Sequence, residues 1–295
     1  PAASGLAPTL QRLRAGWQAA APDFRQRRDD LQRLRAALKR RMDEMAAAIS
    51  ADFGHRSVHE SRIADGMTVL NGIDHLCKHL RGWMRPQRVG VGWRLLPARA
   101  QIRPMPLGVV GVIAPWNYPV NLALIPLATA IAAGNHVYLK PSEHTPRTAE
   151  FLRSLLAEVF PPDRVAVATG GAEIGAAFAA LPFDHLVFTG STAVGRKVMA
   201  AAAPNLTPLT LELGGKSPVL IADDYPIEQA AARIATGKWF NGGQTCIAPD
   251  YVLVPKGKRD ALVKALRAEV LARYGEHFEN VGDYARIIND GQFAR

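Results

Sequence analysis

Residues 8–53 carry apolar side chains at intervals of three and four, separated by arginine, glutamine and alanine. The apolar positions are Leu10, Leu13, Trp17, Leu31, Leu34, Leu38, Met42 and Met45. This spacing is typical of amphipathic helices. The sequence Ala21-Pro22-Asp23 interrupts it, so we expect two helices in this region. A further helix is expected over about residues 58–84, because Arg85-Pro86 follows and proline disfavours helical backbone in the residue before it.

Residues 87–106 interrupt the helical pattern. The stretch from Val89 to Pro97 contains Gly90 and Gly92, and it is followed by Ala100-Gln-Ile-Arg-Pro104. This composition predicts an extended two-stranded arm. An isolated hairpin is only marginally stable in water, so we expect the arm to pack on another subunit.

From residue 107 onward, short apolar runs alternate with helical segments. Strands buried on both faces are predicted at 107–113, 135–139, 164–168 and 185–189, and helices at about 119–133, 145–159, 172–180 and 192–202. Repeated strand-helix units predict an α/β fold with a parallel sheet. Ligands of such sheets bind at the carboxyl ends of the strands, where the polar motifs of this chain are found.

A second α/β block follows the first. It is predicted to contain a strand at 218–222, a helix at about 226–240, a strand at 251–254 and a helix at 257–273. The last twenty residues show only weak periodicity.

Composition excludes several classes of protein. A content of 48% hydrophobic and 21% charged residues is typical of a soluble globular chain, and no apolar run is long enough to span a membrane. Cys77 and Cys246 are far apart in the sequence, which predicts neither a disulfide framework nor a metal site and favours a reducing, cytoplasmic setting.

The net charge of +10 raises the question of a nucleic-acid partner. However, the arginines of residues 11–41 are interleaved with aspartates, and no aromatic residues are spaced among them for stacking on bases. We therefore expect a solvated helical face and no nucleic-acid partner.

Cys246 follows the glycine-bearing segment from Asn241 to Thr245. Glycines let backbone N–H groups approach a reacting atom, so this setting suits a thiol nucleophile. A buried, inert cysteine is the alternative.

Two strand ends carry polar groups suited to catalysis or cofactor binding. Asn117, in the turn from Ala114 to Pro119, could donate its amide to an oxyanion, or it could cap the next helix. Lys140 and Glu143 follow the next strand and suit the hydroxyls of a ribose, or they form a surface ion pair.

Two further strand ends complete the set. Gly190 and Ser191 open a helix after a strand, where free N–H groups favour an anion. The spacing from Gly190 to Gly195 resembles a P-loop, but Arg196 replaces its lysine, so a dinucleotide pyrophosphate is favoured over nucleotide hydrolysis. Glu212 precedes two glycines, where partial desolvation would make its carboxylate a general base. A structural role is the alternative for this glutamate.

Five of these motifs occur together and in one order: Pro115-Trp-Asn-Tyr-Pro119, Lys140-Pro-Ser-Glu143, Phe188-Thr-Gly-Ser-Thr192, Glu212-Leu-Gly-Gly215 and Gly243-Gln-Thr-Cys246. In this combination the chain resembles the NAD(P)-dependent aldehyde dehydrogenase superfamily from about residue 8 to its end. The segment Gln244-Thr-Cys-Ile-Ala-Pro249 and the short N-terminus are most similar to the branch that oxidises fatty or aromatic aldehydes, coniferyl aldehyde in particular.

The resemblance implies roles for these residues. Cys246 would be the nucleophile that forms a thiohemiacetal and then a thioester. Asn117 and the Cys246 backbone N–H would hold the oxyanion, and Glu212 would be the general base for hydrolysis. The implied cofactor is NAD, with NADP as an alternative, bound by Trp116, Lys140, Ser142, Glu143, Gly190, Ser191 and Leu213. The implied substrate pocket consists of Tyr118, Leu122, Thr245 and Ile247.

The resemblance also implies a domain organisation. Residues 1–86 would pack on the cofactor domain, 87–106 would form the oligomerisation arm, 107–212 the Rossmann-like dinucleotide-binding domain and 213–295 the first part of a catalytic domain. A homodimer or homotetramer is expected.

The chain departs from the superfamily in one respect. The Glu-x-Phe-Gly-Pro segment, whose glutamate binds the nicotinamide ribose, and the strand after it do not occur. We therefore expect an incomplete catalytic domain. Two alternatives remain at this point: a truncated, non-catalytic binding protein, and an aldehyde dehydrogenase that transfers the acyl group to coenzyme A.

Overall fold

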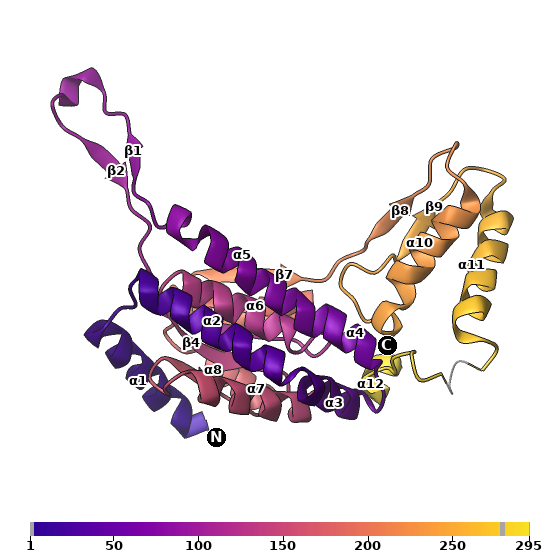
Figure 1. Cartoon of the computed structure of the whole chain (residues 1–295), viewed down its shortest axis with the longest axis horizontal. Coiled ribbons are helices and arrows are strands. Elements are labelled where there is room, and N and C mark those ends of the chain that lie inside the picture. The colour runs from indigo at the N-terminus through magenta and orange to yellow at the C-terminus, as the bar shows by residue number, and fades with distance from the viewer. Residues whose placement is uncertain (1–2, 278–280, 295) are drawn as a thin grey trace.

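The computed structural model describes residues 3–277 and 281–294, and its centre is a five-stranded parallel sheet (Figure 1). The strand order is β5-β4-β3-β6-β7. The strands are β3 Val109–Ile113, β4 His136–Lys140, β5 Val165–Val167, β6 His185–Gly190 and β7 Leu209–Leu213. The predicted α/β fold with a parallel sheet is confirmed.

Helices cover both faces of the sheet and enclose two separate cores. One core packs α2 Phe24–Arg40, α3 Met42–Phe53, α5 Thr68–Trp83, α6 Asn121–Ala132 and α7 Pro146–Val159 against side chains such as Val112 and Leu139. The other packs α1 Leu6–Ala19, α8 Ala172–Ala179 and α9 Thr192–Ala202 against Val109 and Phe188.

Burial decreases toward the edges of the sheet. Every residue of β3 and β4 is buried, as predicted, whereas β6 has both buried and half-buried positions and β7 is half-buried or exposed throughout. The prediction of two buried faces was therefore wrong for β6, and also for β5, whose last two residues are half-buried. β5 and β7 are the edge strands, each with a neighbour on one side only, and β6 pairs with β7.

The N-terminal region contains three helices, where the sequence predicts two. The expected break before Phe24 is present, but a second one occurs at Arg41, whose φ of −103° and ψ of 23° lie outside the helical range. The predicted helix at 58–84 is also divided, into α4 Val58–Ser61, the π-helix η2 Arg62–Met67 and α5. Apolar periodicity continues through these breaks, so it does not reveal them.

The predicted arm is a hairpin that projects from the body (Figure 1). Its strands β1 Gln87–Val89 and β2 Ala100–Ile102 pair antiparallel, and all six of their residues are exposed. The 3-10 helix η3 Trp93–Leu95 lies at its tip. That the arm packs on a second subunit stays a prediction.

A second α/β unit follows β7 through the exposed residues 214–216 (Figure 1). Its strands β8 Pro218–Leu220 and β9 Tyr251–Leu253 pair in parallel. Its helices α10 Ile227–Trp239 and α11 Arg259–Tyr274 pack on them around a small core that includes Ile221, Ile234 and Leu262. The short helix α12 Asp290–Phe293 ends the described chain.

The remaining short elements are η1 Ala3–Gly5, η4 Ala203–Asn205 and η5 Phe240–Gly243. Within the described ranges, no helix is both long and apolar enough to cross a membrane. The same residues contain no group of three or more histidine, cysteine, aspartate or glutamate side chains placed to hold a metal ion.

Candidate active site

Residues 241–246, here called the cysteine loop, leave α10 in a left-handed turn. Asn241, Gly242 and Gly243 have φ values of 55°, 60° and 80°. Asparagine and glycine are the residues that adopt this conformation at low cost. A Cβ at Gly242 would lie 2.7 Å from the carbonyl oxygen of Ala285, so this position requires glycine for space as well as for backbone conformation.

Residues 281–294, at the end of the described chain, hold the cysteine loop through Gln244. The Gln244 Nε2 donates to the carbonyl oxygens of Asn241 and Arg286, at 2.9 and 3.0 Å, and its Oε1 accepts from the Ile288 N–H at 3.0 Å. Cys246 comes two residues later and is an exposed, free thiol. Cys246 is therefore not buried in the described chain, and its role as a nucleophile stays a prediction.

The turn at residues 114–119, here called the asparagine turn, contacts the cysteine loop directly. The Asn117 Nδ2 donates to the Gln244 carbonyl oxygen at 3.0 Å, and the Asn241 Nδ2 donates to the Asn117 carbonyl oxygen at 2.9 Å. The Tyr118 hydroxyl lies 2.5 Å from the Thr245 Oγ1. Two segments more than 120 residues apart in the sequence are thus joined next to Cys246.

Asn117 does not cap the helix that follows it. The N–H groups of Val120 and Asn121 at the start of α6 donate to the Asp65 Oδ1, at 3.0 and 2.9 Å. The capping alternative is therefore wrong, because an aspartate from the π-helix η2 performs that task. The Asn117 amide instead donates to the Gln244 carbonyl oxygen.

A buried ion pair lies against the asparagine turn, and none of the sequence motifs predicted it. Arg56 and Asp65 are 1% and 0% exposed, and the Arg56 Nη1 is 3.1 Å from the Asp65 Oδ2. The same Nη1 donates to the Asn117 carbonyl oxygen at 3.4 Å. Charged residues in an amphipathic region normally indicate a solvated face, so this pair could not be predicted from the sequence pattern.

Glu212 is exposed, near the carboxyl end of β7. The described residues leave this carboxylate open to solvent, so the partial desolvation expected for it stays a prediction. The cause of its exposure is its place on an edge strand, with the exposed residues Leu213 and Gly214 after it. Among the described side chains, no hydrogen bond or ion pair joins Glu212 to Asn117 or Cys246.

Lys140 and Glu143 meet at the carboxyl end of β4. The Lys140 ammonium is almost wholly buried and donates to the Glu143 Oε2 at 3.1 Å, while Glu143 is partly open to solvent. Burial alone would raise the pKa of Glu143, but a backbone N–H and the Lys140 charge outweigh it and lower that pKa. The buried Ser142 Oγ accepts from the His144 N–H and shapes the same turn.

Gly190 is the last residue of β6, and Ser191 precedes α9. The Ser191 side chain accepts from the Val194 N–H at 3.3 Å and caps the helix. Leu213 is paired with Gly190 across the sheet, and a Cβ at Gly195 would lie 2.8 Å from the Leu213 side chain. Helix α9 therefore approaches the end of β7 closely at a glycine.

The predicted substrate residues differ in their exposure within the described chain. Tyr118 is buried, Leu122 and Thr245 are half-buried, and Ile247 is 78% exposed. Trp116 is half-buried, with its ring centroid 6.4 Å from that of Phe53.

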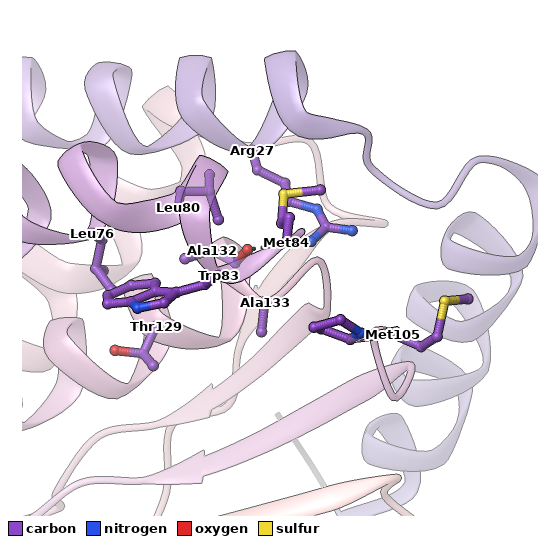
Figure 2. A pocket seen from close by; sticks show the side chains of 10 residues that line it. Arg27, Leu76, Leu80, Trp83, Met84, Met105, Thr129, Ala132 and Ala133 are labelled. Carbon is purple, nitrogen blue, oxygen red and sulfur yellow. Dashed lines mark hydrogen bonds between the residues drawn. The ribbon is translucent and has the colours of Figure 1, made fainter. Parts of the chain in front are cut away.

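Figure 2 shows a different hollow, which none of the predicted site residues lines. Its walls come from α2, α5, α6 and the base of the arm. The lining residues are Arg27, Leu76, Leu80, Trp83, Met84, Pro104, Met105, Thr129, Ala132 and Ala133.

Comparison with known proteins identifies the family. A family model described as "Aldehyde dehydrogenase family" matches residues 11–295. The chain belongs to the aldehyde dehydrogenase family. Among its relatives in the family, a "Probable coniferyl aldehyde dehydrogenase" of Pseudomonas aeruginosa is 49% identical over 274 residues, covering 93% of this chain and 57% of that protein. A coniferyl aldehyde dehydrogenase of a Pseudomonas species is 45% identical over 266 residues, 90% of this chain and 54% of that protein.

Solved structures of the family have the same fold. The substrate-bound state of Staphylococcus aureus AldH matches with a TM-score of 0.92 and 37% identity, over 96% of this chain and 62% of that one. A mutant of AldC from Pseudomonas syringae in complex with NAD+ and octanal matches with a TM-score of 0.86 and 27% identity, over 99% and 60%. The chain thus spans little more than half the length of these family members.

Proposed function

We propose that the complete protein containing this chain oxidises an aldehyde to its carboxylic acid with NAD. The observation that carries the proposal is the contact between the asparagine turn and the cysteine loop, in which the Asn117 amide bonds to Gln244, two residues before the exposed Cys246. Covalent catalysis at a carbonyl needs both a nucleophile and a donor to the developing oxyanion.

In this proposal Cys246 attacks the aldehyde carbon, and the carbonyl oxygen becomes an oxyanion. The Asn117 amide and the Cys246 backbone N–H stabilise that charge. When bound, the dinucleotide supplies the acceptor for the hydride that leaves the same carbon. Glu212 then takes a proton from the water that hydrolyses the thioester on Cys246, which releases the acid and the free thiol.

Several residues fit the dinucleotide. Lys140 and Glu143 offer an ammonium and a carboxylate side by side at a strand end, which suits the two hydroxyls of a ribose. The first N–H groups of α9 have no acceptor within the helix, and with Gly190 and Ser191 they suit the pyrophosphate. Trp116, Ser142 and Leu213 complete the proposed site.

The negative charge of Glu143 favours NAD over NADP, because a carboxylate repels a 2′-phosphate. The lowered pKa of Glu143 supports this preference by keeping the carboxylate ionised at neutral pH. Comparable rates with the two dinucleotides would contradict it.

The substrate we propose is an aromatic aldehyde such as coniferyl aldehyde, or a medium- or long-chain aldehyde. The two Pseudomonas relatives support the aromatic class. Tyr118, Leu122, Thr245 and Ile247 would form the mouth of its pocket. We also propose a cytoplasmic protein that assembles as a homodimer or homotetramer through its arm, which the particle mass in solution would test.

The test is NADH formation by the complete protein across aromatic and aliphatic aldehydes. We expect turnover without coenzyme A, and we expect Cys246→Ala to lower kcat by several orders of magnitude because it removes the nucleophile. Cys77→Ala is the matched control, since it removes the other thiol and should leave kcat unchanged. Full activity of Cys246→Ala would contradict the proposal, and a requirement for coenzyme A would contradict hydrolysis.

A further inference from the structure

The ion pair between Arg56 and Asp65 is buried at the junction of the two α/β units. Both side chains are shielded from solvent, with their charged atoms 3.1 Å apart. The Arg56 guanidinium lies between two aromatic rings, 5.2 Å from the Phe53 centroid and 5.0 Å from the Tyr118 centroid. Among the described residues, its Nε and Nη2 are buried without a hydrogen-bond partner.

Stability is a weak explanation for such a pair. Removing two charges from water costs more free energy than their attraction usually returns, and apolar residues of similar size are often as stable or more so. The two guanidinium nitrogens without partners add to that cost. An explanation must therefore come from what the two side chains hold in place.

The two side chains hold the asparagine turn at two places, one within the turn and one directly after it. Asp65 accepts from the N–H groups of Val120 and Asn121, immediately after the turn. Arg56 donates to the carbonyl oxygen of Asn117 within the turn, and its guanidinium covers the ring of Tyr118. The position of the Asn117 backbone, and with it the direction of its amide, is thus tied to this pair.

The cysteine loop contacts both the side chain and the backbone of Asn117. It contributes the Gln244 carbonyl oxygen, which accepts from the Asn117 Nδ2, and the Asn241 Nδ2, which donates to the Asn117 carbonyl oxygen. The wholly buried Asn241 bridges to Gln244 as well, at 3.3 Å. The cysteine loop and the ion pair, which belong to different units of the molecule, therefore both donate a hydrogen bond to the Asn117 carbonyl oxygen.

We propose that the Arg56–Asp65 pair is a positioning element that aims the Asn117 amide at the oxyanion formed on the aldehyde. This inference rests on the proposed function of Cys246 and Asn117. Arg56 and Asp65 touch neither thiol nor aldehyde, and they act through Asn117.

The test is a double-mutant cycle in the complete protein, with the rate constant of the NADH burst as its readout. Arg56→Met keeps an unbranched, largely apolar stem and removes the charged guanidinium. We expect it to slow the burst roughly 100-fold, the effect of a ~1 Å misplacement of a catalytic group. In the Asn117→Ala background the same change should have no further effect, because the amide that it positions is gone. Arg56→Lys should restore part of the rate.

A second readout separates positioning of the Asn117 amide from a change at the thiol itself. Alkylation of Cys246 by iodoacetamide, measured in a Cys77→Ser background, needs an accessible thiol but forms no oxyanion. We expect the Arg56→Met protein to be alkylated at the wild-type rate. If that variant does not fold, shown by the loss of a cooperative thermal unfolding transition, the paired change Arg56→Met with Asp65→Leu removes both charges and serves in its place.

The outcomes are distinct. Losses that add up in the Asn117→Ala background, or a wild-type burst in a normally alkylated Arg56→Met protein, would overturn the positioning role while the proposed function stands. A wild-type protein that forms no NADH with any aldehyde would overturn the proposed function and this inference together.

Discussion

A glutamate outside every predicted motif, Glu60, holds the first residue of the cysteine loop. Its carboxylate oxygens accept from the Asn241 N–H at 3.2 and 3.3 Å. Burial raises the pKa of Glu60, and Asp283 raises it further, while the Asn241 N–H and Arg56 offset only part of the shift. The ionised form of this side chain is therefore less favourable in the folded protein than in the unfolded chain.

The raised pKa of Glu60 predicts a pH dependence of stability. A folded pKa above the unfolded value contributes stability that is present below the unfolded pKa and lost as the pH rises through the folded pKa. The neutral substitution Glu60→Gln lacks this loss. We expect the Tm of the variant, relative to that of the wild type, to increase as the pH rises from below 4.5, the ordinary pKa of glutamate, toward neutrality. A constant difference in Tm over that range would contradict the assignment.

At the scale of elements, apolar pattern predicted the sheet well and the site only in part. β3 and β4 are continuous apolar runs because both faces are covered, and their ends were predicted within two residues. The strand ends then located Asn117, Lys140 and Ser191, because the carboxyl ends of parallel strands share one edge.

The sequence could not predict what depends on contacts between distant segments. Arg56 and Asp65 lie in a region of helical periodicity, and nothing in that pattern indicates that one π-helical turn buries the aspartate under α6. The exposure of Glu212 depends on what packs over β7, which its own strand pattern does not contain.

The conformation of Gly242 in the cysteine loop leads to a prediction about the stability of the protein. Alanine there would carry a Cβ at a φ of 60° and 2.7 Å from the Ala285 carbonyl oxygen. We expect Gly242→Ala to lower the free energy of unfolding by about 1–3 kcal/mol, measured by urea unfolding.

Gly82→Ala, near the end of α5, is the matched control. An added Cβ there meets no atom within 4 Å, and alanine favours a helix over glycine by about 1 kcal/mol. Equal effects of the two substitutions would show that the left-handed turn does not constrain the loop.

At the scale of the whole molecule, the candidate site lies where two α/β units meet. The parallel sheet and its helices supply the asparagine turn and the buried ion pair, and the unit after β7 supplies Cys246. Each unit has its own core, so each can hold its part of the site rigid. The two meet through the polar contacts of Asn117, Tyr118 and Glu60 with the cysteine loop, so we expect catalysis to depend on how the units are joined.

The central claim is that an aldehyde is oxidised while covalently bound to Cys246, and trapping that species tests it most directly. In Glu212→Gln the proposed base is gone, so the thioester should form and then hydrolyse slowly. Mixed with NAD and an aromatic aldehyde, the complete Glu212→Gln protein should show an NADH burst at the wild-type rate, followed by slow turnover. The peptide containing Cys246 should gain the mass of the aldehyde less two hydrogen atoms. A burst without this acyl group on Cys246, or equal loss of burst and turnover, would contradict the account.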